Sequence, residues 1–250
     1  MTRLLKILFE DEYLLAINKD PCMHSVMQHK SIENSIAFAL SNYLKDAAFI
    51  SPKKEDSGLV QRLDFETSGV IIAAKSRKVW DLLHEASASN SMQKTYLSLV
   101  EGHFPNSLKL ENFIGTSGRR SKKVRVFTKQ ARTKFRPLPA VTSFKLLKFF
   151  KDLNLSLIEA HIYVGRRHQL RAHAAFVGHP LIGDVLYGSS RSIEELGHNL
   201  KFPGNCPDFF LHARCLKLKH PKTKRTLLIE APLPEWTNNI KILSTFSQLS

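Results

Sequence analysis

The chain has 250 residues, of which 43% are hydrophobic, so it can bury one sizeable core, and overall disorder is disfavoured. It carries 37 Lys and Arg against 22 Asp and Glu, a formal net charge of +15, which favours a polyanionic partner. Its three scattered cysteines make neither a disulfide framework nor a Cys-x-x-Cys zinc pair. Without a signal-like start or a run of about 18 apolar residues, secretion and membrane insertion are disfavoured, and a cytoplasmic location fits best.

Short strands outnumber helices along the chain. In chain order, the apolar patterns predict strands over residues 7–9, 14–18, 69–74, 94–102, 141–147, 155–164, 215–219 and 226–230. Helical spacing predicts one helix from residue 31 to about 46 and another around residues 79–83. A slip in alternation at Leu157 and Ile158 predicts a β-bulge. Because several strands follow one another directly, we expect a largely antiparallel α+β sheet.

A basic segment spans residues 119–136. It contains no acidic residue and nine basic ones: Arg119, Arg120, Lys122, Lys123, Arg125, Lys129, Arg132, Lys134 and Arg136. Two interpretations stay open, because a charge run is often a solvated loop but also suits an arm that follows a phosphate backbone. Phe127 and Phe135 are compatible with both, since they can pack the arm or stack on bases.

Two stretches carry candidate chemistry. In residues 58–70, Arg62 and Asp64 lie two apart in a loop rich in small and hydroxyl residues, directly before an apolar strand. Taken alone, an aspartate there more often accepts local backbone hydrogen bonds than acts in catalysis. The second stretch, residues 164–188, contains Gly165-Arg166-Arg167-His168-Gln169-Leu170-Arg171-Ala172-His173 and then Gly178-His179-Pro180-Leu181-Ile182-Gly183-Asp184-Val185-Leu186-Tyr187-Gly188.

Together these stretches resemble the signature motifs of the RluA-type pseudouridine synthases. Those motifs are His-Arg-Leu-Asp-x-x-Thr-Ser-Gly and Gly-Arg-Thr-His-Gln-Ile-Arg-x-His, the latter followed by Gly-His-Pro-Ile-x-Gly-Asp-x-x-Tyr-Gly. The resemblance runs nearly end to end and includes residues 7–12, Asn18-Lys19, Lys94-Thr95-Tyr96, residues 211–213 and residues 231–234. The chain departs from the pattern at four positions. Gln61 replaces the usual histidine, Val164 and Arg167 each replace a usual threonine, and Asp20 stands where the family commonly has proline.

The resemblance implies the pseudouridine synthase fold, an α+β domain whose mixed, mainly antiparallel sheet has flanking helices and a central cleft. It implies an isomerase that converts uridine in rRNA or tRNA to pseudouridine with no cofactor and no metal. Asp64 is then the catalytic aspartate, Arg171 the arginine that pairs with it, and Tyr96 the active-site tyrosine. Arg62 is similar to the arginine that helps extrude the target nucleotide, because a stacked base is not accessible to a catalyst.

The remaining expectations concern RNA contacts and domain organisation. We expect substrate binding by Arg62, Arg166, His168, Gln169, Lys122 and Lys123. We expect a single catalytic domain over residues 1–250, without the S4-type RNA-binding domain that often precedes it in the family. RNA is the expected partner of a monomer that has no membrane association and no obligate protein partner.

Other interpretations of the same residues are weaker. His168 and His173 are five residues apart, about 140° around a helix, whereas a metal pair is normally i, i+4. Their ordinary role is to satisfy loop backbone around the cleft. A hydrolase pair of Ser68 and His168 lacks a Gly-x-Ser-x-Gly turn around the serine. The rival from another class is an RNA-binding or ribosome-assembly protein that keeps the fold without the chemistry, which the intact catalytic residues argue against.

Overall fold

The computed structural model describes residues 5–28, 32–116, 118, 121–130, 136–196 and 208–233. The chain divides into two compact units. Unit 1 comprises Met1–Lys94 and His212–Pro234, and unit 2 comprises Thr95–Leu211 and Glu235–Ser250. Each unit has its own strands, helix packing and apolar cluster, so the two are described in turn.

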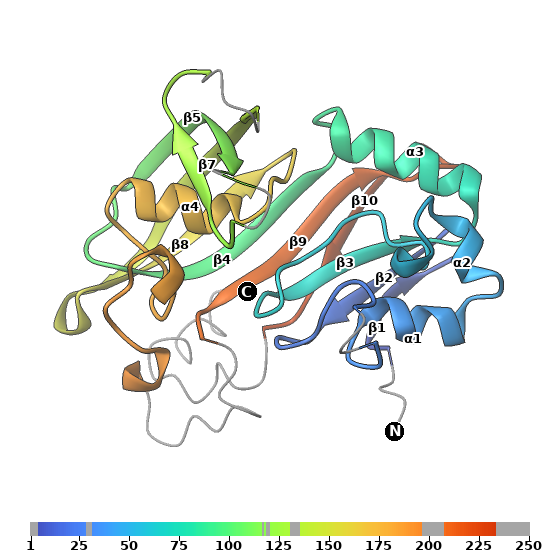
Figure 1. Ribbon diagram of the computed structural model, residues 1–250, viewed down its shortest axis with the longest axis horizontal. Coiled ribbons are helices and arrows are strands. Elements are labelled where there is room, and N and C mark those ends of the chain that lie inside the picture. The colour runs from blue at the N-terminus through green and yellow to red at the C-terminus, as the bar shows by residue number, and fades with distance from the viewer. Residues whose placement is uncertain are drawn as a thin grey trace. The chain divides into compact units, whose positions relative to one another are not determined.

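Unit 1 is built on a mixed sheet. Its strands, in spatial order, are β1 (Ile7–Glu10), β2 (Leu14–Lys19), β3 (Ser68–Ala74), β9 (Leu211–Lys219) and β10 (Thr226–Glu230). Neighbours are antiparallel except for β3 and β9, which are parallel. The helices are α1 (Ile36–Tyr43), α2 (Ala47–Ile50) and α3 (Arg77–Ala88), with a 3-10 turn η1 (Lys54–Asp56), as Figure 1 shows for the three α-helices.

The core of unit 1 forms around β3 and α3. All seven residues of β3 are buried, which explains why that strand reads as a continuous apolar run instead of an alternating one. The hydroxyl of Ser76 caps α3 by accepting a hydrogen bond from the N–H of Val79. The buried face of α3, with Val79, Trp80 and Leu83, belongs to the same apolar cluster as Ile72 of β3. This packing fixes the strand that follows the Asp64 loop.

Unit 2 is built on strands β4 (Gln93–Glu101), β5 (Ser107–Thr116), β6 (Val124–Phe127), β7 (Leu138–Phe150) and β8 (Leu155–Ile162). Their spatial order is β4-β8-β7-β5-β6, and the β5–β6, β5–β7 and β7–β8 pairs are antiparallel. The 3-10 turns are η2 (Lys151–Leu153), η3 (Val185–Tyr187) and η4 (Ile193–Leu196). Helix α4 (Gln169–Phe176) packs on this sheet (Figure 1), because Ala172 shares an apolar cluster with Ile114, Val124 and Ala140.

The predicted α+β class with a mainly antiparallel sheet is confirmed, and each of the eight predicted strands is present. Two further strands, β5 and β6, were not predicted, and β6 lies inside the basic segment, where charged residues obscure its alternation. The first helix was predicted too long, since α1 starts only at Ile36, after its cap Ser35.

The predicted β-bulge is confirmed in place but belongs to the neighbouring strand. The register of β7 against β8 shifts between Leu146 and Lys148, which pair with Ile158 and Leu157. The additional residue is therefore on β7, opposite the two residues whose alternation slipped. A bulge leaves one residue unpaired, bends the strand that carries it and increases the local twist.

Two further features concern membrane-spanning helices and the cysteines. Within the described ranges, no helix has the length and apolar character needed to cross a membrane. Cys215 is a free cysteine, whereas Cys22 is disulfide-bonded, which the sequence did not predict.

Candidate active site

Asp64 lies in the loop before β3, and its two neighbours in sequence are both held by hydrogen bonds. The hydroxyl of Ser25 accepts from the N–H of Leu63 at 2.9 Å and donates to the carbonyl of the same residue at 2.8 Å. On the other side, the carbonyl of Phe65 accepts from the N–H of Cys22 at 2.9 Å. Asp64 itself is partly exposed. The loop therefore presents a carboxylate in a fixed position, which suits a group that must meet a bound substrate.

A buried lysine at the end of β2 supports the same loop. Lys19 is 0% exposed, and its ammonium donates to the carbonyls of Asp20 at 2.9 Å, Met23 at 2.7 Å and Phe65 at 3.1 Å. Burial lowers the pKa of Lys19 to about 7, and the negative charge of Asp64 opposes this lowering. Lys19 was noted in the sequence only as part of a motif. A lysine at the end of an otherwise apolar strand was the signal for its role.

We expect Lys19→Met to lower the free energy of unfolding at pH 7 by about 2–4 kcal/mol, because three carbonyls lose their hydrogen-bond donor, whether it is an ammonium or a neutral amine. The lowered pKa also sets a pH dependence. Between about pH 7 and the usual lysine value of 10.5, the unfolded chain binds more protons than the folded chain, so the contribution of Lys19 to stability rises with pH. Urea unfolding at pH 7 and pH 9 should show the gap between wild type and variant widening. A constant gap would contradict the assignment.

Arg62 is anchored by a carboxylate of η1. Its Nη2 donates to Asp56 Oδ1 at 2.9 Å, and the aspartate side chain is 12% exposed while that of the arginine is 53% exposed. The ion pair therefore has one buried and one solvent-facing member. A guanidinium held in this way keeps a defined direction while part of its surface stays accessible to another molecule.

Arg171 forms a buried, two-pronged ion pair in unit 2. From α4, its Nε donates to Asp184 Oδ2 at 2.6 Å and its Nη2 donates to Asp184 Oδ1 at 2.8 Å. The two side chains are only 7% and 1% exposed. The guanidinium also lies over the rings of Phe209 and Tyr187, at 4.4 and 5.1 Å from their centroids. Sequence reasoning gave Asp184 no role, although it lay inside the quoted motif.

The turn that presents Asp184 requires a glycine before it. Gly183 has a φ of +85°, and a Cβ at this position would lie 1.7 Å from the carbonyl oxygen of Asp208. The N–H of Gly183 also donates to the hydroxyl of Ser189 at 3.0 Å. Any other residue would have to displace backbone, so the chain approaches closely here only because glycine has no side chain.

Gln169, the first residue of α4, is engaged inside unit 2. It is 2% exposed, and its Nε2 donates to the carbonyl of Val141 at 2.9 Å and to the hydroxyl of Thr142 at 3.0 Å. Its Oε1 accepts from the N–H of Arg166 at 2.9 Å. These bonds hold the start of α4 against β7 and fix the backbone of Arg166. In the structure, Gln169 therefore positions the start of α4; that it binds RNA itself stays a prediction.

Arg166 and His168 lie in the turn that leads into α4. The Nε of Arg166 donates to the carbonyl of Pro139 at 3.0 Å, and the residue is half-buried. His168 has a φ of +50° and places its Nδ1 3.0 Å from the hydroxyl of Tyr187. Both residues are thus fixed by neighbours within unit 2 while keeping partial exposure.

The other histidines of the motif have structural contacts. His173 lies within α4, with its Nδ1 2.8 Å from the hydroxyl of Thr142, and burial lowers its pKa to about 4. The expectation that it would satisfy loop backbone is therefore wrong for His173. His179 places its Nδ1 2.8 Å from the carbonyl of Glu101, the last residue of β4. Among the described residues, no group of three or more His, Cys, Asp and Glu side chains is arranged to hold a metal ion.

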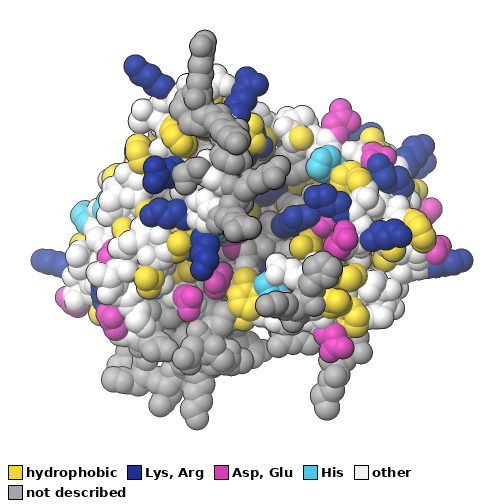
Figure 2. All heavy atoms as spheres, viewed as in Figure 1, with side chains coloured by type: hydrophobic (Ala, Val, Ile, Leu, Met, Phe, Trp, Pro, Cys, Tyr) yellow, Lys and Arg dark blue, Asp and Glu magenta, His cyan; other side chains and the backbone are white. Residues whose placement is uncertain are grey.

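The described part of the basic segment is a strand with exposed cations. Residues 121–130 include β6, and Lys122, Lys123 and Arg125 are exposed there. Figure 2 shows Lys and Arg side chains projecting into solvent on the visible face. The guanidinium of Arg167 donates to the carbonyls of Ser121 at 3.1 Å and Lys122 at 2.6 Å. The simple loop interpretation is thus wrong for β6. Arg119, Arg120, Arg132, Lys134 and Phe135 lie outside the described residues.

The candidate residues belong to both units. Asp64 and Arg62 lie in unit 1, and Tyr96 lies on β4 in unit 2, where it is 8% exposed. Unit 2 also carries the other candidates, Arg166, His168, Gln169, Arg171, Lys122 and Lys123. Within unit 2 the structure brings His168, Arg171 and Lys123 around Tyr187. That Asp64 works together with Tyr96 and Arg171 stays a prediction.

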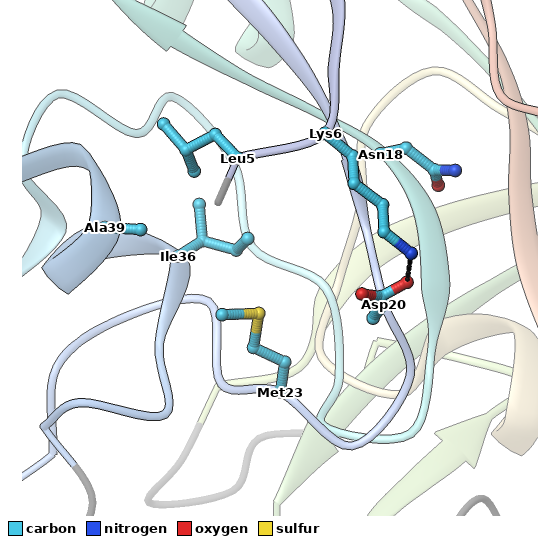
Figure 3. A pocket seen from close by; sticks show the side chains of 7 residues that line it. All are labelled: Leu5, Lys6, Asn18, Asp20, Met23, Ile36 and Ala39. Carbon is cyan, nitrogen blue, oxygen red and sulfur yellow. Dashed lines mark hydrogen bonds and ion pairs between the residues drawn. The ribbon is translucent and has the colours of Figure 1, made fainter. Parts of the chain in front are cut away.

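A small surface pocket in unit 1 contains none of the predicted site residues (Figure 3). Its polar contact is an ion pair between Lys6 and Asp20 at 2.8 Å. The side chains that line it are Leu5, Lys6, Asn18, Asp20, Met23, Ile36 and Ala39. With one paired charge of each sign and a mostly aliphatic wall, it offers no chemistry of its own.

Comparison with known proteins identifies relatives over most of the chain. A family model described as RNA pseudouridylate synthase matches residues 13–176. The Yersinia pestis protein named ribosomal large subunit pseudouridine synthase C is 36% identical over 233 residues, covering 91% of this chain and 65% of that protein. The protein of the same name from Escherichia coli K12 is 33% identical over 238 residues, covering 92% of this chain and 66% of the relative. The chain thus spans about two thirds of the length of these relatives.

Two solved human structures share the fold. RNA pseudouridylate synthase domain containing 4 superposes with a TM-score of 0.69 at 23% identity, covering 96% of this chain and 92% of that one. RNA pseudouridylate synthase domain containing 1 gives a TM-score of 0.66 at 21% identity, covering 94% of this chain and 85% of the other. At this identity the likeness concerns the fold alone.

Proposed function

Because the chain belongs to the RNA pseudouridylate synthase family, we propose that it isomerises uridine in RNA to pseudouridine, with Asp64 as the catalytic aspartate. The RluA-type family predicted from the motifs is confirmed. The observation that carries the proposal is the Asp64 loop. It presents a partly exposed carboxylate between Leu63 and Phe65, both held by hydrogen bonds, inside the stretch that the family model matches.

The proposed reaction replaces one bond to the ribose by another. The N1–C1′ bond of uridine breaks, the base turns, and a C5–C1′ bond forms, while C5 loses a proton and N1 gains one. The electrons balance without an oxidant or a reductant, so this chemistry requires no redox cofactor. A carboxylate suits the cleavage because it is anionic at neutral pH and can add to, or stabilise, an oxocarbenium-like ribose carbon.

The roles of the other residues follow the family resemblance. From the resemblance, we assign to Arg171 the task of pairing with Asp64 and aiming its carboxylate at the substrate. Tyr96 is assigned to stacking on the flipped base. Arg62 is assigned to filling the space that the base leaves, which its half-exposed side chain, anchored on Asp56, supports.

The substrate, assembly and location are also proposals. The relatives are named for the large ribosomal subunit, so we propose ribosomal RNA as the first substrate to test and transfer RNA as the second. We propose that residues 1–250 act as one catalytic domain and as a monomer. We also propose a cytoplasmic location, where thiols are normally kept reduced. Cys22 would then be reduced in the cell, so the activity of the purified protein should persist in dithiothreitol.

The function is tested by mapping pseudouridine. Purified protein is incubated with total RNA from a strain that lacks it, and pseudouridine is mapped at nucleotide resolution in ribosomal and transfer RNA. We expect new sites that depend on the added protein. RNA binding without any new site in either class would contradict the enzyme and support the alternative, an RNA-binding module that keeps the fold.

Neutralising two exposed lysines beside β6 should weaken RNA binding. We expect the double variant Lys122→Ala and Lys123→Ala to reduce affinity and to lower the salt slope by about one unit per lost phosphate contact. Filter binding from low to high salt measures this. The matched control is Lys222→Ala with Lys224→Ala, which removes the same charge from the turn after β9. Equal effects of the two double variants would mean that net charge alone matters.

A further inference from the structure

We propose that Tyr187 is a positioning residue that fastens the basic strand β6 to the start of α4, so that the exposed lysines directly before β6, Lys122 and Lys123, meet RNA in one fixed arrangement. This rests on the proposed function, because it assumes an RNA substrate. Tyr187 lies outside residues 13–176, the stretch that the family model matches.

The hydroxyl of Tyr187 joins two elements of unit 2. The N–H of Val124, the first residue of β6, donates to it at 3.0 Å, and the Nδ1 of His168 lies 3.0 Å from it. Since the phenol oxygen already accepts from β6, its own hydrogen is available to His168 whenever Nδ1 carries no proton. Tyr187 is 9% exposed, so these bonds form largely out of water, where an unpaired partner would be costly.

The ring of Tyr187 lies close to two cations, one on α4 and one on the residue directly before β6. The guanidinium of Arg171 is 5.1 Å from the ring centroid, and the ammonium of Lys123 is 5.7 Å from it. One side chain therefore contacts a proposed catalytic arginine and a proposed RNA-binding lysine. Both distances fall within the range of cation–π attraction.

A second contact fixes the chain just before β6. Arg167, where the family usually has threonine, donates to the carbonyls of Ser121 and Lys122 at 3.1 and 2.6 Å. The short run of residues 121–124 is thus held at both ends by hydrogen bonds, to Arg167 at its start and to Tyr187 at its end. This run carries the side chains of Lys122 and Lys123.

Such ties matter because β6 is a short strand at the edge of its sheet. It has four residues, pairs with β5 and ends the strand order of unit 2. An edge strand is hydrogen-bonded to a neighbour on one side only, so β6 has fewer ladder bonds to hold it than an inner strand. If β6 moved freely, RNA binding would have to order it, and that cost would reduce affinity. A preformed strand avoids the cost.

The test combines variants in a cycle, with filter binding to an unmodified large-subunit ribosomal RNA transcript over a series of salt concentrations. Tyr187→Phe removes the hydroxyl but keeps the ring over which Arg171 lies. We expect it to weaken RNA binding by about three- to tenfold, the value of one hydrogen bond, and to raise KM more than it lowers kcat. Neutralising Lys122 and Lys123 should cost less affinity in the Tyr187→Phe background than in the wild type.

Two controls separate positioning from general loss of structure. Tyr43→Phe removes another tyrosine hydroxyl, which donates to Glu10 in unit 1 at 2.8 Å, and should leave RNA affinity unchanged. Arg167→Lys keeps the charge but loses the two-pronged contact, and should reproduce part of the Tyr187→Phe effect. This second variant carries the test if Tyr187→Phe does not fold.

The outcomes are distinct. The proposal would be overturned if the effects of Tyr187→Phe and the lysine variants on RNA affinity were additive. It would also be overturned if both Tyr187→Phe and Arg167→Lys kept the wild-type affinity and salt slope. A third contrary result would be a lower melting temperature for Tyr187→Phe while the lysine substitutions cost the same RNA affinity with and without it. That result would indicate a purely structural role for Tyr187. Because filter binding reports affinity and not product formation, a failure of the proposed enzyme activity would appear separately, in the pseudouridine map.

Discussion

Asp64→Asn should reduce pseudouridine formation by at least about 10⁴-fold, the scale seen when a group at the reacting centre is removed. The amide keeps the shape of the side chain but cannot act as an anionic nucleophile or stabilise an oxocarbenium-like carbon. The loop should persist, because Ser25 holds Leu63 and Lys19 holds Phe65 through backbone atoms that the substitution does not touch. Single-turnover assays on the mapped RNA substrate, together with filter binding, measure the two effects.

The control for this variant is Asp81→Asn on α3. Asp81 is another aspartate of unit 1, and its side chain is 55% exposed and paired with Arg77. We expect Asp81→Asn to keep wild-type turnover. We expect Asp64→Asn to keep RNA binding within about threefold, because asparagine keeps the shape of the aspartate side chain and such small substitutions usually change free energies little. Undiminished turnover in Asp64→Asn would refute the proposed mechanism.

Asp184→Asn should have the largest effect on stability. It removes the charge that pairs with Arg171 where the two side chains are 7% and 1% exposed. Leaving a buried cation without its counter-ion costs about 3–5 kcal/mol in comparable pairs. We also expect turnover to fall, because both hydrogen bonds that orient the guanidinium are lost or weakened. Urea unfolding followed by single-turnover assays below the transition measures both effects.

The Arg77–Asp81 pair again supplies the comparison. It joins the same residue types at 3.0 Å, but its side chains are 54% and 55% exposed. Exposed pairs of this kind are worth about 0–1 kcal/mol, so Asp81→Asn should be nearly as stable as the wild type. If Asp184→Asn were equally mild, the buried pair would not be needed for the fold. Normal turnover in a destabilised Asp184→Asn would show that Asp184 serves stability alone.

The local pattern of residues was enough to predict most of the sheet. Alternation revealed β4, and a continuous apolar run revealed β3, because strand periodicity and full burial leave direct marks in the sequence. The strand β6 was missed because its alternation is Val, Arg, Val, Phe within a run of cations, which reads as a charged loop. The start of α1 was misplaced because its cap, Ser35, comes inside a stretch of helical spacing.

The candidate site divides in the same way. The sequence by itself determined the family and singled out Asp64, Arg62, Tyr96 and Arg171, because short motifs preserve the order of chemical groups along the chain. Lys19, Asp184 and Tyr187 gained their roles only from the tertiary structure. Burial lowers the pKa of Lys19 and makes its three carbonyl contacts valuable, Asp184 meets Arg171 from a turn that requires Gly183, and Tyr187 joins strand to helix. Each depends on the distance between segments and on exclusion of water, and neither quantity is present in a linear pattern.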